Sequence, residues 1–142
     1  MKQRIFVLLL ISMIAVLSGC GQQAAPAPVT ADGQIDLAAL PALVDPVTVN
    51  QIRERSDVLL IDVREQTEYD AGHIPGITLI PMGEIGKRLA DIPKDKTVIV
   101  SCQSGRRSSQ VASFLQEQGF TNIHDLDGGF SAWQRAGLPV EQ

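Results

Sequence analysis

The chain has 142 residues, with two cysteines, two histidines and a formal net charge of −4. This length suits one domain with short terminal segments, and two cysteines are too few for a disulfide-dense scaffold. The excess of acidic over basic residues argues against nonspecific nucleic-acid binding. The cysteines and histidines lie scattered along the chain, which argues against a zinc site. We therefore expect no metal, no cofactor and no nucleic-acid partner.

The N-terminus has the pattern of an export signal. Lys2 and Arg4 precede the apolar run 5–17, which is shorter than the roughly 20 residues that cross a membrane. The run ends in the tetrapeptide Leu-Ser-Gly-Cys, which resembles a bacterial lipobox with Cys20 as the lipidated residue. We expect 1–19 to be a lipoprotein signal peptide and the rest to be a membrane-anchored lipoprotein outside the cytoplasm, in the cell envelope. An uncleaved N-terminal anchor is the alternative, and it gives the same side of the membrane.

The segment after the signal has the composition of a tether. Residues 20–45 begin with the expected lipid anchor and continue as an Ala/Pro-rich stretch without apolar periodicity, which is typical of a flexible linker. Within it, 34–45 contains apolar residues interrupted by Pro41, so we expect that part to be extended or weakly ordered. The folded domain is predicted to span 46–142.

Helical and strand patterns alternate through the domain. Thr48 and Gln51 have the spacing of a capping box, which predicts a short helix to about Arg55. Apolar runs then predict strands at 58–62, 77–80 and 97–101, and a last short strand is expected at 123–126. Helical periodicity or stop signals predict helices at 65–71, 83–90, 108–118 and 128–136. Strands that alternate with helices indicate an α/β fold, here with a parallel sheet of about five strands and helices on both faces.

Cys102 lies at the position where α/β folds of this kind commonly bind ligands. It follows the strand 97–101 and precedes a helix, and parallel sheets bind ligands at the carboxyl ends of their strands. A helix N-terminus and the basic Arg106 and Arg107 favour a thiolate over a thiol. Gly105 allows the loop to curl its N–H groups around the sulfur as an anion nest. These residues predict a reactive thiolate in an anion-binding cradle rather than a buried structural cysteine.

Four motifs between 58 and 140 resemble those of single-domain rhodanese-like proteins, and they occur in that family's order. They are Leu60-Ile61-Asp62-Val63-Arg64-Glu65 with Glu68-Tyr69, Gly72-His73-Ile74-Pro75-Gly76, Cys102 with Gly105 and Arg107, and Leu126-Asp127-Gly128-Gly129-Phe130 with Trp133, Gly137 and Pro139. The resemblance implies one rhodanese-like domain that covers nearly the whole folded region.

The resemblance also implies a sulfurtransferase of the thiosulfate:cyanide type. In such an enzyme Cys102 takes a sulfane sulfur from a thiosulfate-like donor, becomes a persulfide, and passes the sulfur to cyanide or a thiol. Loop N–H groups would stabilise the persulfide, and the two arginines would attract an anionic donor. The implied substrate-binding loop consists of Gln103, Ser104, Gly105, Arg106, Arg107 and Ser108.

Three other residues of the matched motifs are expected to support the fold rather than take part in the reaction. Asp62 and Arg64 lie at a strand end and are expected to organise loops, and His73 precedes a turn and is expected to be hydrogen-bonded. Two other functions stay open: a sulfur-carrier or binding module without turnover, and a phosphatase or arsenate reductase on the same fold. The latter is disfavoured because phosphatases of this general kind use Cys-x5-Arg, whereas Cys102 and Arg107 are spaced as Cys-x4-Arg.

Overall fold

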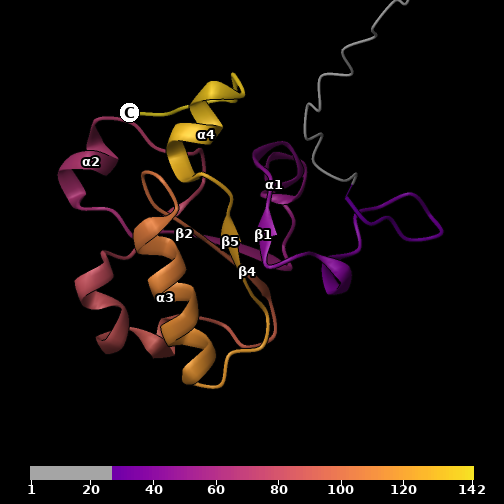
Figure 1. Ribbon diagram of the computed structural model, residues 1–142, viewed down its shortest axis with the longest axis horizontal. Coiled ribbons are helices and arrows are strands. Elements are labelled where there is room, and N and C mark those ends of the chain that lie inside the picture. The colour runs from indigo at the N-terminus through magenta and orange to yellow at the C-terminus, as the bar shows by residue number, and fades with distance from the viewer. Residues whose placement is uncertain (1–26) are drawn as a thin grey trace, which may run out of the picture.

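A computed structural model describes residues 27–142, which form an α/β fold around one parallel sheet (Figure 1). The sheet has five strands in the order β1-β5-β4-β2-β3, and every pairing is parallel. This confirms the predicted fold class. The strands are β1 (Leu43–Val44), β2 (Val58–Asp62), β3 (Thr78–Leu79), β4 (Thr97–Ser101) and β5 (Ile123–Leu126). The α-helices are α1 (Pro46–Ile52), α2 (Gln66–Asp70), α3 (Arg106–Glu117) and α4 (Gly129–Arg135), and the 3-10 helices are η1 (Leu37–Ala39), η2 (Met82–Lys87) and η3 (Leu89–Asp91).

Helices cover both faces of the sheet, and each face has its own apolar core. On one face Val111 and Leu115 of α3 and Ile85 of η2 pack on the sheet. On the other face Val49 of α1 and Trp133 of α4 do so, and Figure 1 shows α3 and α1 on different sides. Because the central strands are buried on both faces, their sequences are continuous apolar runs without alternation.

The fifth strand comes from the segment that the sequence assigned to the tether. Leu43 and Val44 pair with Asp125 and Leu126 of β5, and Val44 is buried in the core. Without β1, one edge of β5 would expose its backbone groups to unwanted pairing. The sheet therefore includes residues before the predicted start at 46. The predicted signal peptide and lipidation site lie outside the described residues, and within 27–142 no helix is both long and apolar enough to cross a membrane.

The start of α1 differs from the predicted one. Its N-cap is Asp45, whose Oδ1 accepts hydrogen bonds from the N–H groups of Val47 and Thr48 at 3.0 Å each. Thr48 instead lies inside the helix and donates its hydroxyl to Asp45 Oδ2 at 2.6 Å. The prediction of Thr48 as N-cap was wrong because Asp45 precedes Pro46, and proline is favoured in the first helical position.

The predicted helix at 83–90 is also wrong in type. The chain there forms the two short 3-10 helices η2 and η3, in which the Arg88 N–H donates to the Ile85 carbonyl three residues earlier, at 3.1 Å. Gly83 and Gly86 lower the helical propensity of this stretch. The apolar pattern correctly places Ile85 in the core, but it does not distinguish a 3-10 helix from an α-helix.

Candidate active site

Cys102 lies between the carboxyl end of β4 and the first turn of α3, which begins at Arg106 rather than at the predicted residue 108. Gly105 is the N-cap of α3, with a left-handed φ of +93° that glycine adopts without steric cost. This turn directs the Gly105 N–H to the Cys102 sulfur at 3.2 Å. The Ser108 hydroxyl donates to the same sulfur at 3.4 Å. The loop therefore directs a backbone donor and a hydroxyl donor to the sulfur.

These donors favour the thiolate. Burial by itself would raise the pKa of Cys102, because a buried charge loses its hydration. Hydrogen bonds from the Ser108 hydroxyl and from the backbone N–H groups of Ser108, Ser104 and Gly105 outweigh burial, so the pKa of Cys102 lies below its usual value. A lowered pKa raises the fraction of the nucleophilic form at neutral pH.

The N-terminus of α4 holds the Cys102 loop in place through hydrogen bonds to the loop carbonyl groups. Its Phe130 N–H donates to the Cys102 carbonyl at 2.8 Å, and its Ser131 N–H donates to the Gln103 carbonyl at 3.0 Å. A Cβ atom on Gly129 would collide with the Cys102 carbonyl and lie 2.9 Å from the Ser104 nitrogen. Because the loop carbonyls face α4, the loop N–H groups remain free to face the sulfur.

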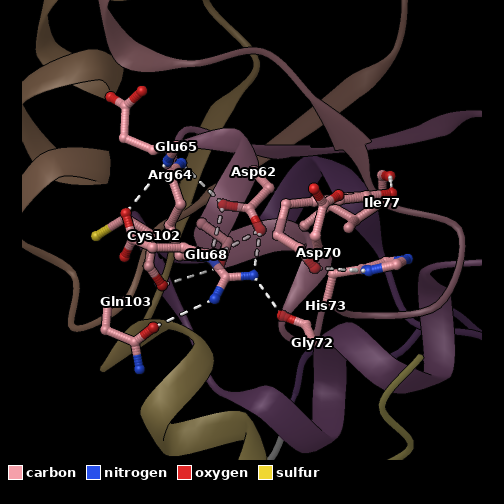
Figure 2. Close-up of polar contacts among 12 residues, drawn as sticks. Asp62, Arg64, Glu65, Glu68, Asp70, Gly72, His73, Ile77, Cys102 and Gln103 are labelled. Carbon is pink, nitrogen blue, oxygen red and sulfur yellow. Dashed lines mark hydrogen bonds and ion pairs between the residues drawn. The ribbon is translucent and has the colours of Figure 1, made fainter. Parts of the chain in front are cut away.

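The buried Arg64 side chain connects several loops through hydrogen bonds (Figure 2). Its guanidinium group donates to both carboxylate oxygens of Asp62, at 2.8 to 3.1 Å, and to the Gly72 carbonyl at 2.8 Å. It also donates to the Gln103 side chain at 3.2 Å and lies 4.3 Å from the centre of the Phe130 ring. This geometry agrees with the expectation that Asp62 and Arg64 organise loops.

His73 also has the surroundings of a structural residue. Its ring stacks on Tyr69 with centroids 3.8 Å apart, and its Nδ1 is 3.0 Å from the Tyr69 carbonyl. Its backbone forms a bridge with Glu141, so the C-terminal end of the chain lies beside α2 (Figure 1). None of these contacts reaches the Cys102 sulfur.

The two arginines of the loop have different roles in the structure. Arg107 forms two hydrogen bonds of 2.7 Å to the Glu68 carboxylate, so part of its charge is neutralised. Arg106 is exposed and forms no ion pair within the described residues. Both line an open hollow of about 380 Å³ beside Cys102, together with Ser104 and Gln110. Arg106 is therefore the loop side chain whose charge is free to meet an anion.

The Gln103 side chain points away from this hollow. Its amide nitrogen donates to the Ser131 hydroxyl of α4 at 2.9 Å, while its oxygen accepts from Arg64. Gln103 therefore belongs to the binding loop through its backbone, and its side chain joins the loop to α4 and to Arg64, which follows β2.

The sequence analysis assigned no role to three residues. Glu68 pairs with Arg107 of the loop, Gln110 lines the hollow beside Cys102, and Asp125 is a buried carboxyl group on β5. The signal for Glu68 was present in the Glu-Tyr motif, and an acidic residue inside the predicted strand 123–126 was the signal for Asp125. The motif does not identify the partner of Glu68, because that partner is distant in sequence.

The chain resembles known sulfurtransferases over most of this fold. The model of the family described as "Rhodanese-like domain" matches residues 45–136. A protein named "Sulfurtransferase" from Allochromatium vinosum is 40% identical over 98 residues, which cover 68% of this chain and 92% of that protein. The "Thiosulfate sulfurtransferase GlpE" of Pseudoalteromonas translucida is 36% identical over 86 residues, covering 61% of this chain and 82% of that protein.

Solved structures agree with these matches. The crystal structure of a rhodanese-related protein from Thermoplasma volcanium has a TM-score of 0.65 to this chain at 29% sequence identity. The similarity covers 71% of this chain and 98% of that structure.

Proposed function

We propose that this chain, which belongs to the rhodanese-like domain family, transfers the outer sulfur of a thiosulfate-like donor to an acceptor through a persulfide on Cys102. In the first step the Cys102 thiolate attacks the outer sulfur of thiosulfate. The S–S bond of thiosulfate breaks, and sulfite leaves with the bonding electron pair. The product on the protein is a persulfide anion, Cys102–S–S⁻, with no net oxidant or reductant consumed.

In the second step a thiophilic acceptor removes the outer sulfur. Cyanide attacks that sulfur, the persulfide S–S bond breaks, and the Cys102 thiolate returns as thiocyanate leaves. Within residues 27–142 Cys102 is the one cysteine, so no second thiol of this domain can resolve the persulfide. The acceptor is therefore expected to be external, either cyanide or a thiol.

The observation that carries this proposal is the pair of hydrogen bonds that the loop donates to the Cys102 sulfur. The Gly105 N–H and the Ser108 hydroxyl both donate to it, and the same groups suit the terminal sulfur anion of a persulfide. The Cys-x4-Arg spacing of Cys102 and Arg107 is one residue shorter than the Cys-x5-Arg spacing of phosphatases, so the loop is less suited to a tetrahedral phosphate. A phosphatase is thus the less supported function.

Intact mass spectrometry tests the proposal directly. The domain is incubated with thiosulfate, and we expect one added sulfur atom on Cys102, with no addition to the Cys102→Ser variant. Adding cyanide should then remove the sulfur and release thiocyanate. A wild-type protein without the adduct, or an equal adduct on Cys102→Ser, would overturn the proposal. Loading without release to any small acceptor would instead support a sulfur carrier, and hydrolysis of an aryl phosphate without loading would support a phosphatase.

We further propose that the protein works outside the cytoplasm on a lipid anchor at Cys20. The support is the sequence alone: a basic head, a short apolar run and a lipobox-like tetrapeptide. Donor and acceptor would then be sulfur compounds of the cell envelope.

A further inference from the structure

An apolar hollow of about 260 Å³ adjoins the hollow beside Cys102. It is lined by Met82, Ile85 and Gly86 of η2 and by Gln110, Val111 and Phe114 of α3. Gln110 lines both hollows, so they meet at this side chain. Among the described residues, no charged side chain lines the apolar hollow.

The surface of α3 changes from charged to apolar along this path. Arg106, Gln110 and Phe114 are spaced four residues apart on α3, and residues at that spacing are neighbours on one face of a helix. Arg106 and Gln110 line the hollow at Cys102, whereas Gln110 and Phe114 line the apolar one. Because one turn of helix rises about 5.4 Å, the apolar hollow lies about one turn beyond the hollow at Cys102.

The opposite wall is η2, which packs against α3 (Figure 1) and leaves space at Gly86. Apart from chain neighbours, a Cβ atom on Gly86 would contact only the Phe114 ring among the described residues, at 3.9 Å. Gly86 does not have a left-handed φ, so its backbone conformation does not require glycine. The absence of a side chain at this position therefore leaves the Phe114 ring open to the apolar part of a ligand.

We propose that the apolar hollow is a subsite for the sulfur acceptor, and that this acceptor is a small thiol with an apolar alkyl or aryl body. The inference rests on the proposed function, in which an external thiol approaches the Cys102 persulfide. The thiol sulfur would occupy the hollow at Cys102, near the positive charge of Arg106, and the body would lie between Gly86 and Phe114. Pockets for drug-sized ligands measure roughly 300–1,000 Å³, so a hollow of about 260 Å³ suits one short alkyl chain or one ring.

The transfer to such a thiol balances without a further reactant. The acceptor thiolate, R–S⁻, attacks the outer sulfur of Cys102–S–S⁻. A new S–S bond forms as the S–S bond of the Cys102 persulfide breaks, and the Cys102 thiolate leaves with the bonding electron pair. The products are R–S–S⁻ and the Cys102 thiolate, so the total charge is unchanged. Cyanide attacks the same sulfur but has no body to fill the apolar hollow, so it serves as the comparison acceptor.

Steady-state kinetics of the full chain with ethanethiol, butanethiol and hexanethiol test the subsite. These thiols share the reacting group and differ in apolar surface, so we expect kcat/KM to rise about two- to fourfold for each added methylene group until the hollow is full. Gly86→Val fills the space beside Phe114. It should lower the ratio of kcat/KM for hexanethiol to kcat/KM for cyanide about tenfold, and the smaller Gly86→Ala, which needs only an ordinary contact with the ring, should lower it about threefold.

Gly83→Val is the matched control. Gly83 lies in the same 3-10 helix, also lacks a left-handed φ, and a Cβ atom there would meet nothing within 4 Å. Its ratio should stay within about twofold of the wild type, as for an ordinary surface substitution. A kcat/KM that does not depend on chain length would overturn the proposal, and so would equal effects of Gly86→Val and Gly83→Val. If the chain also forms a dimer that Gly86→Val dissociates, a second copy rather than an acceptor covers the hollow.

A second measurement needs no sulfur donor. Alkyl methanethiosulfonates transfer an S-alkyl group to the Cys102 thiolate and release methanesulfinate, and peptide mass measures the rate at Cys102. We expect the hexyl reagent to react faster than the methyl reagent in the wild type and to lose most of this advantage in Gly86→Val. A wild type with this preference that forms no persulfide from thiosulfate would refute the proposed function but keep the subsite. Persulfide formation without the preference would refute the subsite alone.

Discussion

The ion pair between Glu68 and Arg107 reduces the positive charge that the loop can offer to an anionic donor beside Cys102. The pair is about a third exposed, and the negative charges of Glu68 and of the Cys102 thiolate both raise the pKa of Arg107. Arg106 lies on the same helix turn without an ion pair in the described structure. The two arginines of the motif therefore differ in what they can offer an anionic donor.

Substitutions at these positions should change donor affinity in opposite directions. Arg106→Gln removes the free charge, so we expect the KM for thiosulfate to rise about three- to tenfold. Glu68→Gln releases Arg107 toward the hollow, so we expect the KM to fall. Steady-state thiocyanate formation at low and high salt measures both, because screening should shrink each difference. Equal effects of the same sign would contradict this division of roles.

The Glu68–Arg107 pair should also make stability depend on pH. The guanidinium group holds the pKa of Glu68 at about 2, below its ordinary value of 4.5, so the folded state binds that proton more weakly than the unfolded chain. The contribution to stability is therefore present above pH 4.5 and is lost as the pH falls toward 2. We expect Glu68→Gln to lose up to about 1 kcal/mol of unfolding free energy at pH 7, since the pair is partly solvated. Urea unfolding should show the same difference at pH 7 and 5 and a smaller one at pH 4 and 3, and a difference that stays constant down to pH 3 would contradict the assignment.

At the scale of elements, the junction between α4 and the Cys102 loop is the contact that shapes the site. Gly129 and Gly137 both have a left-handed φ, of +59° and +69°. A Cβ atom on Gly129 would collide with the loop backbone, whereas one on Gly137 would meet nothing within 4 Å. Gly129 and Gly137 therefore share the left-handed backbone conformation, but only Gly129 lies against the loop backbone.

Alanine substitutions separate backbone strain from the clash. Gly137→Ala should cost about 1 kcal/mol, the usual penalty of a left-handed alanine. Gly129→Ala should cost a further 1–3 kcal/mol, roughly the penalty of overpacking, and should also raise the Cys102 pKa as the loop N–H groups move from the sulfur. Thermal unfolding and the alkylation rate of Cys102 measure the two effects. Similar behaviour of the two variants would show that the junction has no steric role.

The same elements show what the sequence could predict. The strands β2 and β4 were found because continuous apolar runs are typical of strands buried on both faces, and the loop at Cys102 was found because a motif lies between a strand and a helix start. β1 was not found as a strand because two residues carry no periodicity, and its pairing with β5 is a tertiary contact. The same holds for the Glu68 contact with Arg107, because the sequence shows both charges but not their distance.

At the scale of the whole molecule, the folded domain reaches further toward the N-terminus than its composition suggests. Ile35 and Leu37 pack against the core, and the Arg55 side chain donates to the Ile35 carbonyl at 2.9 Å. The segment expected to be a tether up to 45 is therefore partly attached to the domain. Whatever its conformation, the chain from Cys20 to residue 27 can span at most about 25 Å, so a lipid at Cys20 would keep the domain close to the membrane surface.

A substitution at Cys20 tests the location independently of the chemistry. If Cys20 carries the anchor, Cys20→Ala should move the protein from the membrane fraction to the soluble fraction, because lipid chains supply most of the membrane affinity of a lipoprotein. Cys102→Ser is the matched control, and it should stay with the membranes while it loses persulfide formation. Intact mass of the membrane-bound form should show a chain that begins at Cys20 and carries added lipid. Retention of Cys20→Ala at full length would instead indicate that the apolar run 5–17 is an uncleaved anchor.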